Sequence, residues 1–184
     1  LNFLIFFLFF FYFLLYSGSY TKMYIPYEER VKMFDPSLEL VEALTPFNWG
    51  FVFRVRRDGK DYVLKGDDNP ASKEIGVVNA EKSALKRASI IDSVPNLIED
   101  YGWTEGGYAF LKDYVHGSRL CDVNKDIFFG KGLKRKLAVT ITKLHLVGVS
   151  NLDLEETNII ISPNHDDARL FDFNTAITNR GYNA

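Results

Sequence analysis

The chain has 184 residues, with 22 Lys and Arg against 24 Asp and Glu, which gives a net charge of −2 at pH 7. This balance excludes the broad basic surface that nucleic-acid binding requires, so no nucleic-acid partner is expected. The single cysteine, Cys121, excludes a disulfide framework and a cysteine-built zinc site. A hydrophobic content of 47 % excludes a disordered chain and indicates a globular domain of mixed helix and strand.

Residues 1–16 form an apolar segment without a charged side chain. As a helix it would span about 24 Å, slightly less than the roughly 30 Å hydrocarbon core of a membrane. Three interpretations stay open: a membrane anchor or signal peptide, an artefact of translated upstream sequence or of a fragment boundary, and a buried helix. The chain begins at Leu1, and Met23 opens a sequence of ordinary composition. We therefore treat residues 1–22 as a separate segment and expect a cytoplasmic protein that contacts a membrane only through residues 1–16.

The first element expected after this segment is a helix over residues 36–46. Pro46 ends the pattern, because proline cannot continue a helix. The apolar residues on which this prediction rests are Leu38, Leu40, Val41 and Leu44.

A β-hairpin is expected next. Residues 51–56 alternate apolar and polar side chains, as a half-buried strand does. Asp58-Gly59 supplies a type I′ turn, and residues 61–65 return as the second strand.

Helices and strands alternate through the rest of the chain. The periodicity predicts a helix over 74–89, strands over 97–101 and 108–114, a helix over 133–146, and strands over 159–162 and 169–171. The apolar stripe of the first helix contains Val77, Val78, Ala84, Leu85 and Ala88, and that of the second contains Leu133, Leu137, Ala138, Ile141 and Leu144. Together these elements predict an α+β fold.

Charged residues stand at positions where the pattern is apolar. Glu81 lies on the apolar face of the helix over 74–89, and Lys65 at the end of a strand is a candidate partner. A buried carboxylate without a partner costs several kcal/mol, so a pairing is expected. Asp172 stands between Phe171 and Phe173, where an unpaired acid is equally costly.

Each of these residues also has a plain structural interpretation. Lys65 and Glu81 would be an ordinary surface ion pair, and Asp172 a turn or cap residue. Asp153 and Asn158, five residues apart in a non-helical segment, would be simple loop residues, since Asp and Asn favour turns.

Taken in order, these parts resemble a protein kinase, which combines a strand lysine, a helix glutamate, a D-x-x-x-x-N loop and a D-F-G motif. The resemblance covers residues 48–176. It rests on Tyr62-Val63-Leu64-Lys65 for the lysine strand, Glu81 for the helix glutamate, residues 111–117 for the hinge, residues 144–149 for the approach to the catalytic loop, Asp153 to Asn158 for that loop, and Leu170-Phe171-Asp172-Phe173 for the last motif.

The resemblance implies a role for each matching residue. Lys65 would contact the α- and β-phosphates of ATP, and Glu81 would fix its position. Asn158 and Asp172 would bind Mg²⁺, and Asp153 would accept the proton of the hydroxyl acceptor. The nucleotide would also be bound by Gly50 and Val52 of the phosphate loop and by the backbone of Asp113 and Val115 in the hinge. The implied cofactors are ATP and Mg²⁺, and the implied partner is an unidentified protein or small molecule.

The sequence departs from the family pattern in the phosphate loop and the catalytic motif. Thr45, Phe47 and Gly50 occupy the three glycine positions, so only the last glycine is kept. The family's H-R-D reads Asn151-Leu152-Asp153, without the arginine that reads activation-loop phosphorylation. We infer that such regulation is absent.

The D-F-G motif reads D-F-N, and ten residues follow Asn174. The predicted organisation is therefore a kinase-like N-lobe over 23–115, with an antiparallel sheet and an αC-type helix, and a partial, truncated C-lobe over 116–184. These departures resemble atypical kinases of the RIO, lipopolysaccharide and aminoglycoside kinase-like groups. The predicted function is ATP-dependent phosphotransfer. The alternatives are a pseudokinase that binds without turnover and an unrelated α+β fold.

Overall fold

The computed structural model describes residues 25–47, 50–67, 77–130 and 132–178. The apolar segment 1–16, and with it the choice among a membrane anchor, an artefact and a buried helix, lies outside the described residues. Within the described ranges, no helix is long and apolar enough to cross a membrane.

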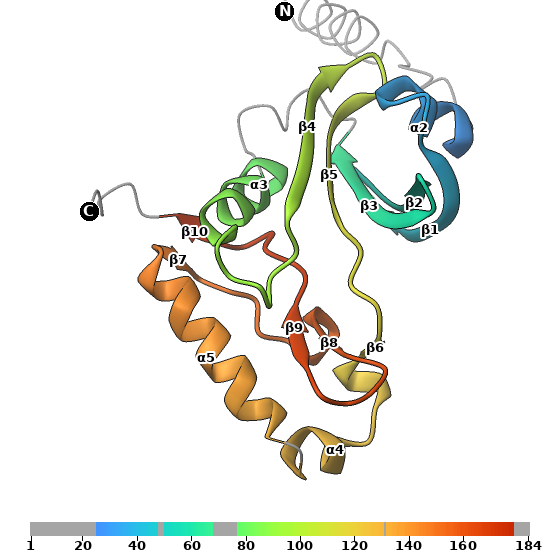
Figure 1. The fold of residues 1–184 in the computed structure, drawn as a ribbon. Helices are drawn as coiled ribbons and strands as arrows, with labels where there is room; N and C mark the ends of the chain where they lie inside the picture. Colours follow the sequence, from blue (N-terminus) through green and yellow to red (C-terminus); the bar gives the residue numbers. More distant parts are fainter. Residues whose placement is uncertain (1–24, 48–49, 68–76, 131, 179–184) are drawn as a thin grey trace, which may run out of the picture.

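An antiparallel five-stranded sheet with the strand order β1-β2-β3-β5-β4 forms the upper part of the molecule (Figure 1). Its strands are β1 (Glu39–Phe47), β2 (Gly50–Arg57), β3 (Lys60–Asp67), β4 (Leu97–Thr104) and β5 (Gly107–Asp113). The hairpin predicted around Asp58-Gly59 is confirmed as β2 and β3. Both turn residues have positive φ, 52° and 76°, as a type I′ turn requires.

Two helices cover opposite faces of this sheet. On one face, Val31 and Phe34 of α2 (Tyr27–Phe34) pack with Phe51, Phe53 and Leu111. On the other, α3 (Val77–Ala88) packs its buried Ala84 and Leu85 against Phe110. Because side chains alternate along a strand, Phe110 and Leu111 of β5 point into different cores.

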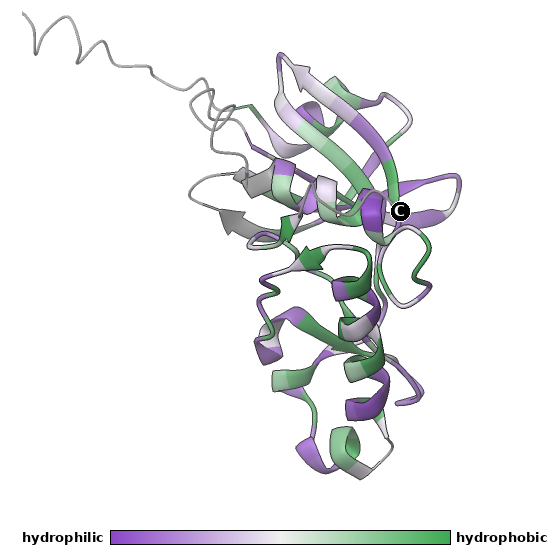
Figure 2. Ribbon diagram, turned by 90° about the vertical axis from the view of Figure 1, so that its left-hand side faces the viewer, coloured by the Kyte–Doolittle hydropathy of each residue, from purple (hydrophilic) through white to green (hydrophobic). Residues whose placement is uncertain are grey.

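The lower part contains α4 (Lys125–Gly130), α5 (Leu133–Leu146) and five short strands. In one small sheet β8 (Ile159–Ile161) lies between β6 (Ser118–Arg119) and β9 (Ala168–Leu170), and in the other β7 (Val149–Ser150) pairs with β10 (Ile177–Thr178). Single 3₁₀ turns, η2 (Leu120–Asp122) and η3 (Glu156–Asn158), precede α4 and β8. Figure 2 shows hydrophobic residues at the centre of this part, where α5 faces the short strands.

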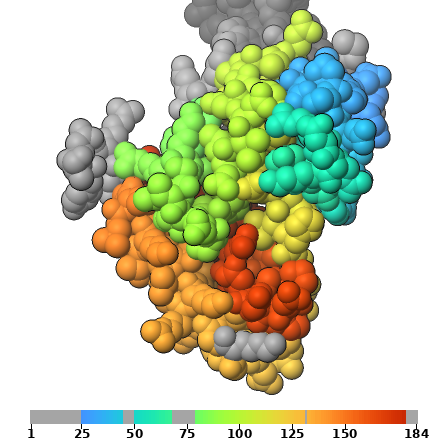
Figure 3. Space-filling model, in the orientation of Figure 1, coloured from blue at the N-terminus to red at the C-terminus, as the bar shows by residue number. Residues whose placement is uncertain are grey.

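The upper and lower parts share one hydrophobic core. Ala84 and Leu85 of α3 belong to the same buried cluster as Leu144 of α5, Leu170 of β9 and Phe173. In the space-filling view the C-terminal strands, in red, lie directly below α3 (Figure 3), and β10 contacts that helix. This shared core fixes the segment after β9 relative to the sheet.

The helix predicted over 36–46 is wrong, because its residues from Glu39 onward lie in the edge strand β1. Two register shifts, one between Leu40 and Glu42 and one between Ala43 and Thr45, interrupt its pairing with β2. A bulge places two residues opposite one, which breaks the alternation of a strand and leaves a spacing that looks helical. Pro46 is tolerated because β1 is at the edge of the sheet.

The other predicted elements are confirmed within a few residues, and the helix over 133–146 has the expected bounds. Its buried face differs at two positions. Ala138 is exposed, whereas Thr140 is buried and its hydroxyl lies 2.6 Å from that of Ser93. The helix predicted over 74–89 is described from Val77 onward. Helices α2 and α4 were not predicted from the sequence. The observed class is α+β.

Candidate functional site

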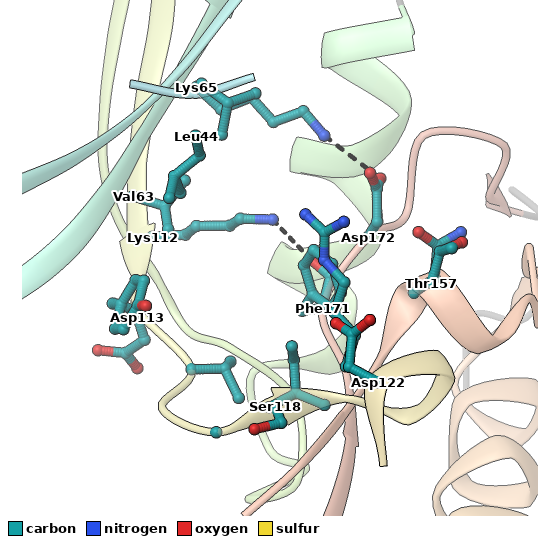
Figure 4. Close-up of a pocket in the computed structure, with 17 residues that line it drawn as sticks. Leu44, Val63, Lys65, Lys112, Asp113, Ser118, Asp122, Thr157, Phe171 and Asp172 are labelled. Carbon is teal, nitrogen blue, oxygen red and sulfur yellow. Dashed lines mark hydrogen bonds and ion pairs between the residues drawn. The ribbon is translucent and has the colours of Figure 1, made fainter. Parts of the chain in front are cut away.

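A cavity of about 520 Å³ lies between the five-stranded sheet and the lower part (Figure 4). This volume is within the usual range for pockets that bind small molecules. Its walls are largely apolar, with Leu44, Val52 and Val63 from the sheet and Ile160 from β8. The charged side chains of Lys65, Lys112 and Asp172 lie together at one end of the cavity, which we call its deep end.

Lys65 extends from β3 into this cavity and forms an ion pair with Glu81 of α3. Its ammonium lies 2.5 Å from Glu81 Oε2, and the Glu81 side chain is completely buried. The pairing expected from the apolar position of Glu81 is therefore present. The interpretation as a surface ion pair is wrong, because only 8 % of the Lys65 side chain is exposed.

Asp172 and Asn174 reach the same ammonium from the segment after β9. Lys65 Nζ donates to Asp172 Oδ1 at 3.2 Å and to Asn174 Oδ1 at 2.8 Å. The backbone N–H of Asn174 donates to Asp172 Oδ1 at 3.0 Å, so Asp172 also stabilises a local turn. Phe173 between them is fully buried in the shared core, which holds this segment in place.

The charges keep Asp172 and Lys65 ionised at neutral pH. Burial by itself would raise the pKa of Asp172, but the positive charges of Lys65 and Lys112 outweigh it and lower the pKa below its usual value. Burial would likewise lower the pKa of Lys65, and the negative charges of Glu81 and Asp172 raise it instead. A carboxylate and an ammonium therefore face the cavity side by side.

Asn158 lines the cavity near Asp172, and its amide Nδ2 donates to the backbone oxygen of Asp153 at 3.3 Å. Asp153 itself is half-buried and lies beside the cavity, outside the residues that line it. The loop before Asp153 is fixed to the segment after Asp172. Asn151 Nδ2 donates to the Thr175 oxygen at 2.7 Å, and Thr175 Oγ1 donates back to the Asn151 oxygen at 2.9 Å.

The predicted nucleotide-binding residues divide into two groups. Val52, Asp113 and Val115 line the cavity. The Asp113 carboxylate, however, accepts hydrogen bonds from Lys60 and from Asn96, so its side chain links the end of β5 to the starts of β3 and β4. Gly50 lies in β2, where a Cβ would come within 2.3 Å of the Gly66 oxygen. This glycine is required by close strand packing, and the tip of its hairpin, residues 48–49, lies outside the described residues.

Lys112 is a site residue that was not predicted from the sequence. Its side chain lines the cavity from β5, forms an ion pair with Glu81 Oε1 and donates to the Phe171 oxygen at 2.6 Å. The signal was present in the sequence, because Lys112 follows Tyr108 and Phe110 at a spacing of two on an apolar strand. A lysine on such a face requires a partner for the same reason as Glu81, because an unpaired buried charge is costly.

The oxygen atoms at the deep end suit a hard cation. Asp172 offers a carboxylate and Asn158 an amide oxygen, and Mg²⁺ is usually held by one or two such protein ligands together with phosphate and water. Among the described residues, no three His, Cys, Asp or Glu side chains gather into a group that could hold a metal by themselves. Water and phosphate oxygens would complete the coordination of a Mg²⁺ ion at this position.

Neither a protein family model nor a curated protein matches the chain.

Proposed function

We propose that the chain is an ATP-dependent phosphotransferase of the protein kinase-like fold, which transfers the γ-phosphoryl group of Mg-ATP to a hydroxyl group. The observation that carries this proposal is the position of the Lys65 ammonium between Glu81 of α3 and Asp172 after β9, at the deep end of a largely apolar cavity. Kinases require the strand lysine, the helix glutamate and the metal-binding aspartate in place together.

The arrangement of the elements supports the same proposal. An antiparallel sheet with one helix that carries the glutamate is the upper lobe that the resemblance implies. In the lower part, β7 and β10 pair with each other, which brings the loop at Asp153 beside the segment at Asp172. Apolar side chains of the sheet and of Ile160 provide two faces between which a flat purine ring can lie.

Phosphoryl transfer depends mainly on holding the phosphates in line and balancing their charge. In this proposal Lys65 donates to phosphate oxygens while Glu81 fixes its position, and Asp172 and Asn158 hold Mg²⁺. Bound Mg²⁺ supplies positive charge to the phosphate oxygens. Asp153 accepts the proton of the acceptor hydroxyl while the hydroxyl oxygen forms a bond to the γ-phosphorus. The bond between the γ-phosphorus and the bridging oxygen breaks, and ADP leaves.

One observation favours a second candidate, a binding module without turnover. Strand pairing between β1 and β2 continues up to Phe47 and Gly50, and Thr45 and Phe47 replace glycines of the family pattern. A side chain at these positions keeps the backbone farther from phosphate than glycine does. A nucleotide held in this way would bind without being aligned for transfer.

The test is a thermal titration of the full 184-residue chain with ATP, with and without Mg²⁺. At one hundred times Kd, a ligand of the folded state stabilises it by about 2.7 kcal/mol, which raises Tm by roughly 5–10 °C for a chain of this size. We expect this rise only with Mg²⁺. Lys65→Met should abolish the rise in Tm. Lys86→Met, which replaces an exposed lysine on α3, should leave it unchanged.

A cooperative melt without a shift would refute the proposed function. A Mg²⁺-dependent shift without release of phosphate or transfer to any hydroxyl acceptor would favour the binding module.

A further inference from the structure

Lys112 is a buried lysine that the proposed catalytic roles do not use. Only 4 % of its side chain is exposed, although it lies on the face of β5 that carries Tyr108 and Phe110. A buried ammonium requires acceptors, and a methionine of similar length would fit an apolar strand at less cost. A lysine at this position therefore calls for an explanation in terms of what it binds.

The Lys112 ammonium joins three elements that are far apart in the sequence. Its stem starts from β5, and its Nζ contacts Glu81 Oε1 on α3 and the Phe171 oxygen after β9. Figure 4 shows the side chain crossing the deep end of the cavity, below Lys65, toward Phe171. Phe171 directly precedes Asp172, so this contact fixes the backbone that carries the carboxylate.

We propose that Lys112 is a positioning residue that ties Glu81 and the Phe171–Asp172 backbone together, so that the phosphate-binding end of the cavity is held assembled before a nucleotide enters. We call the two contacts of the Lys112 ammonium, with Glu81 and with the Phe171 oxygen, the tie. The tie is independent of any nucleotide, whereas its role in phosphate and metal binding rests on the proposed function. The residue acts through Glu81 and Asp172 and needs no contact with the nucleotide.

Lys65 and Lys112 contact different oxygens of the Glu81 carboxylate. Lys65 donates to Asp172 and Asn174, and its contact with Glu81 Oε2 is an ion pair, since that oxygen has no hydrogen-bond partner among the described residues. The third N–H group of the ammonium can therefore donate to a phosphate oxygen. Lys112 holds the other oxygen of Glu81, so the carboxylate keeps its position while Lys65 binds phosphate.

Lys65 also joins α3 to the segment at Asp172, through ion pairs with Glu81 and Asp172. The Lys112 contact differs because it holds the backbone at Phe171 instead of the Asp172 side chain. It therefore stays in place when the Asp172 carboxylate changes its partner.

The test compares Lys112→Met with Lys86→Met in the full chain. The first variant removes the tie, and the second removes an exposed lysine from α3 whose contact to Asp100 is 3.7 Å long. The first measurement is hydrogen–deuterium exchange without nucleotide. We expect faster exchange in α3 and in residues 171–174 for Lys112→Met, and no change for Lys86→Met.

The second measurement compares affinities for Mg-ATP and for adenosine, which has no phosphate. Loss of a hydrogen bond to a charged group corresponds to about a tenfold to hundredfold change in affinity. We expect a change of this size in the Kd for Mg-ATP and less than about a twofold change in the Kd for adenosine. A residue that merely fills the core would weaken both alike.

Unchanged exchange in both segments would overturn the tie, and equal weakening of Mg-ATP and adenosine would overturn the positioning role. If Lys112→Met does not fold, Lys112→Gln, which keeps a donor for the Phe171 oxygen without the charge, is measured in its place. If the unaltered chain binds neither ligand, the proposed function fails, while the exchange measurement still decides whether Lys112 ties the two segments.

Discussion

Replacing Glu81 by Gln tests the centre of the site, because this carboxylate is completely buried between two ammonium groups. Gln keeps the size of the side chain and removes its charge. Lys65 would keep Asp172 and Asn174 as partners, whereas Lys112 would keep only the Phe171 oxygen among the contacts described. Removing one partner from a buried ion pair typically costs about 3–5 kcal/mol, so we expect the free energy of unfolding to fall by that amount at pH 7.

The pH dependence of this loss has a definite sign. Burial lowers the pKa of Lys112 below its ordinary value of 10.5, and Glu81 opposes that effect. Without the Glu81 charge the pKa falls further. Between the folded pKa and 10.5, the unfolded chain binds more protons than the folded chain, so stability rises with pH at up to about 1.4 kcal/mol per unit. The raised pKa of Lys65 removes stability only above 10.5.

Urea denaturation of the full chain near pH 7 and near pH 9.5 measures both effects. The deficit of Glu81→Gln relative to the unaltered chain is expected to shrink at the higher pH. The matched control is Glu99→Gln, which removes a 45 % exposed carboxylate paired with Arg57 and should cost less than about 1 kcal/mol. A loss as small for Glu81→Gln as for Glu99→Gln, or a deficit that grows with pH, would mean that the Glu81 charge does not stabilise the two buried ammonium groups.

Three further substitutions test separate parts of the site. Asp172→Asn should remove the Mg²⁺ dependence of nucleotide binding and leave metal-free binding nearly unchanged, as measured by titration calorimetry; an equal loss of both would contradict a metal role. Asp153→Asn should leave the Kd for Mg-ATP within about twofold and abolish phosphate transfer, because proton acceptance follows binding; unchanged turnover would exclude Asp153 as the base. Gly50→Ala should lower stability by about 1–3 kcal/mol in urea denaturation, because the added methyl group would meet the Gly66 oxygen; a neutral result would mean that the two strands separate easily.

Local signals explain which features were predicted correctly. The Asp58-Gly59 dipeptide specifies its turn through backbone conformations that few residues adopt, so the β2–β3 hairpin could be predicted without knowing its neighbours. The helix over 133–146 carries a regular apolar stripe. The pairing of Lys65 and Glu81 followed from a different principle, since a carboxylate on a buried face requires a cation.

The missed features depend on contacts between distant residues. The bulges of β1 are defined by its pairing with β2, and no pattern within residues 39–47 reveals them. Thr140 is buried because the hydroxyl of Ser93 provides a partner, which the helix alone does not indicate. The resemblance places Lys112 in the hinge, whereas its side chain enters the core between Glu81 and Phe171.

The β1–β2 hairpin makes the proposed nucleotide site depend strongly on metal. Backbone N–H groups of a glycine-rich loop normally contribute to phosphate binding, but here strand pairing reaches Phe47 and Gly50, and side chains replace two of the glycines. Lys65 and a cation at Asp172 and Asn158 must then balance most of the phosphate charge. We expect chelation of Mg²⁺ to weaken ATP binding by about a hundredfold, or about 2.7 kcal/mol, and to leave adenosine binding unchanged. ATP binding that survives chelation would mean that the hairpin holds the phosphates after all, and the assignment of charge balance to Lys65 and the metal would be wrong.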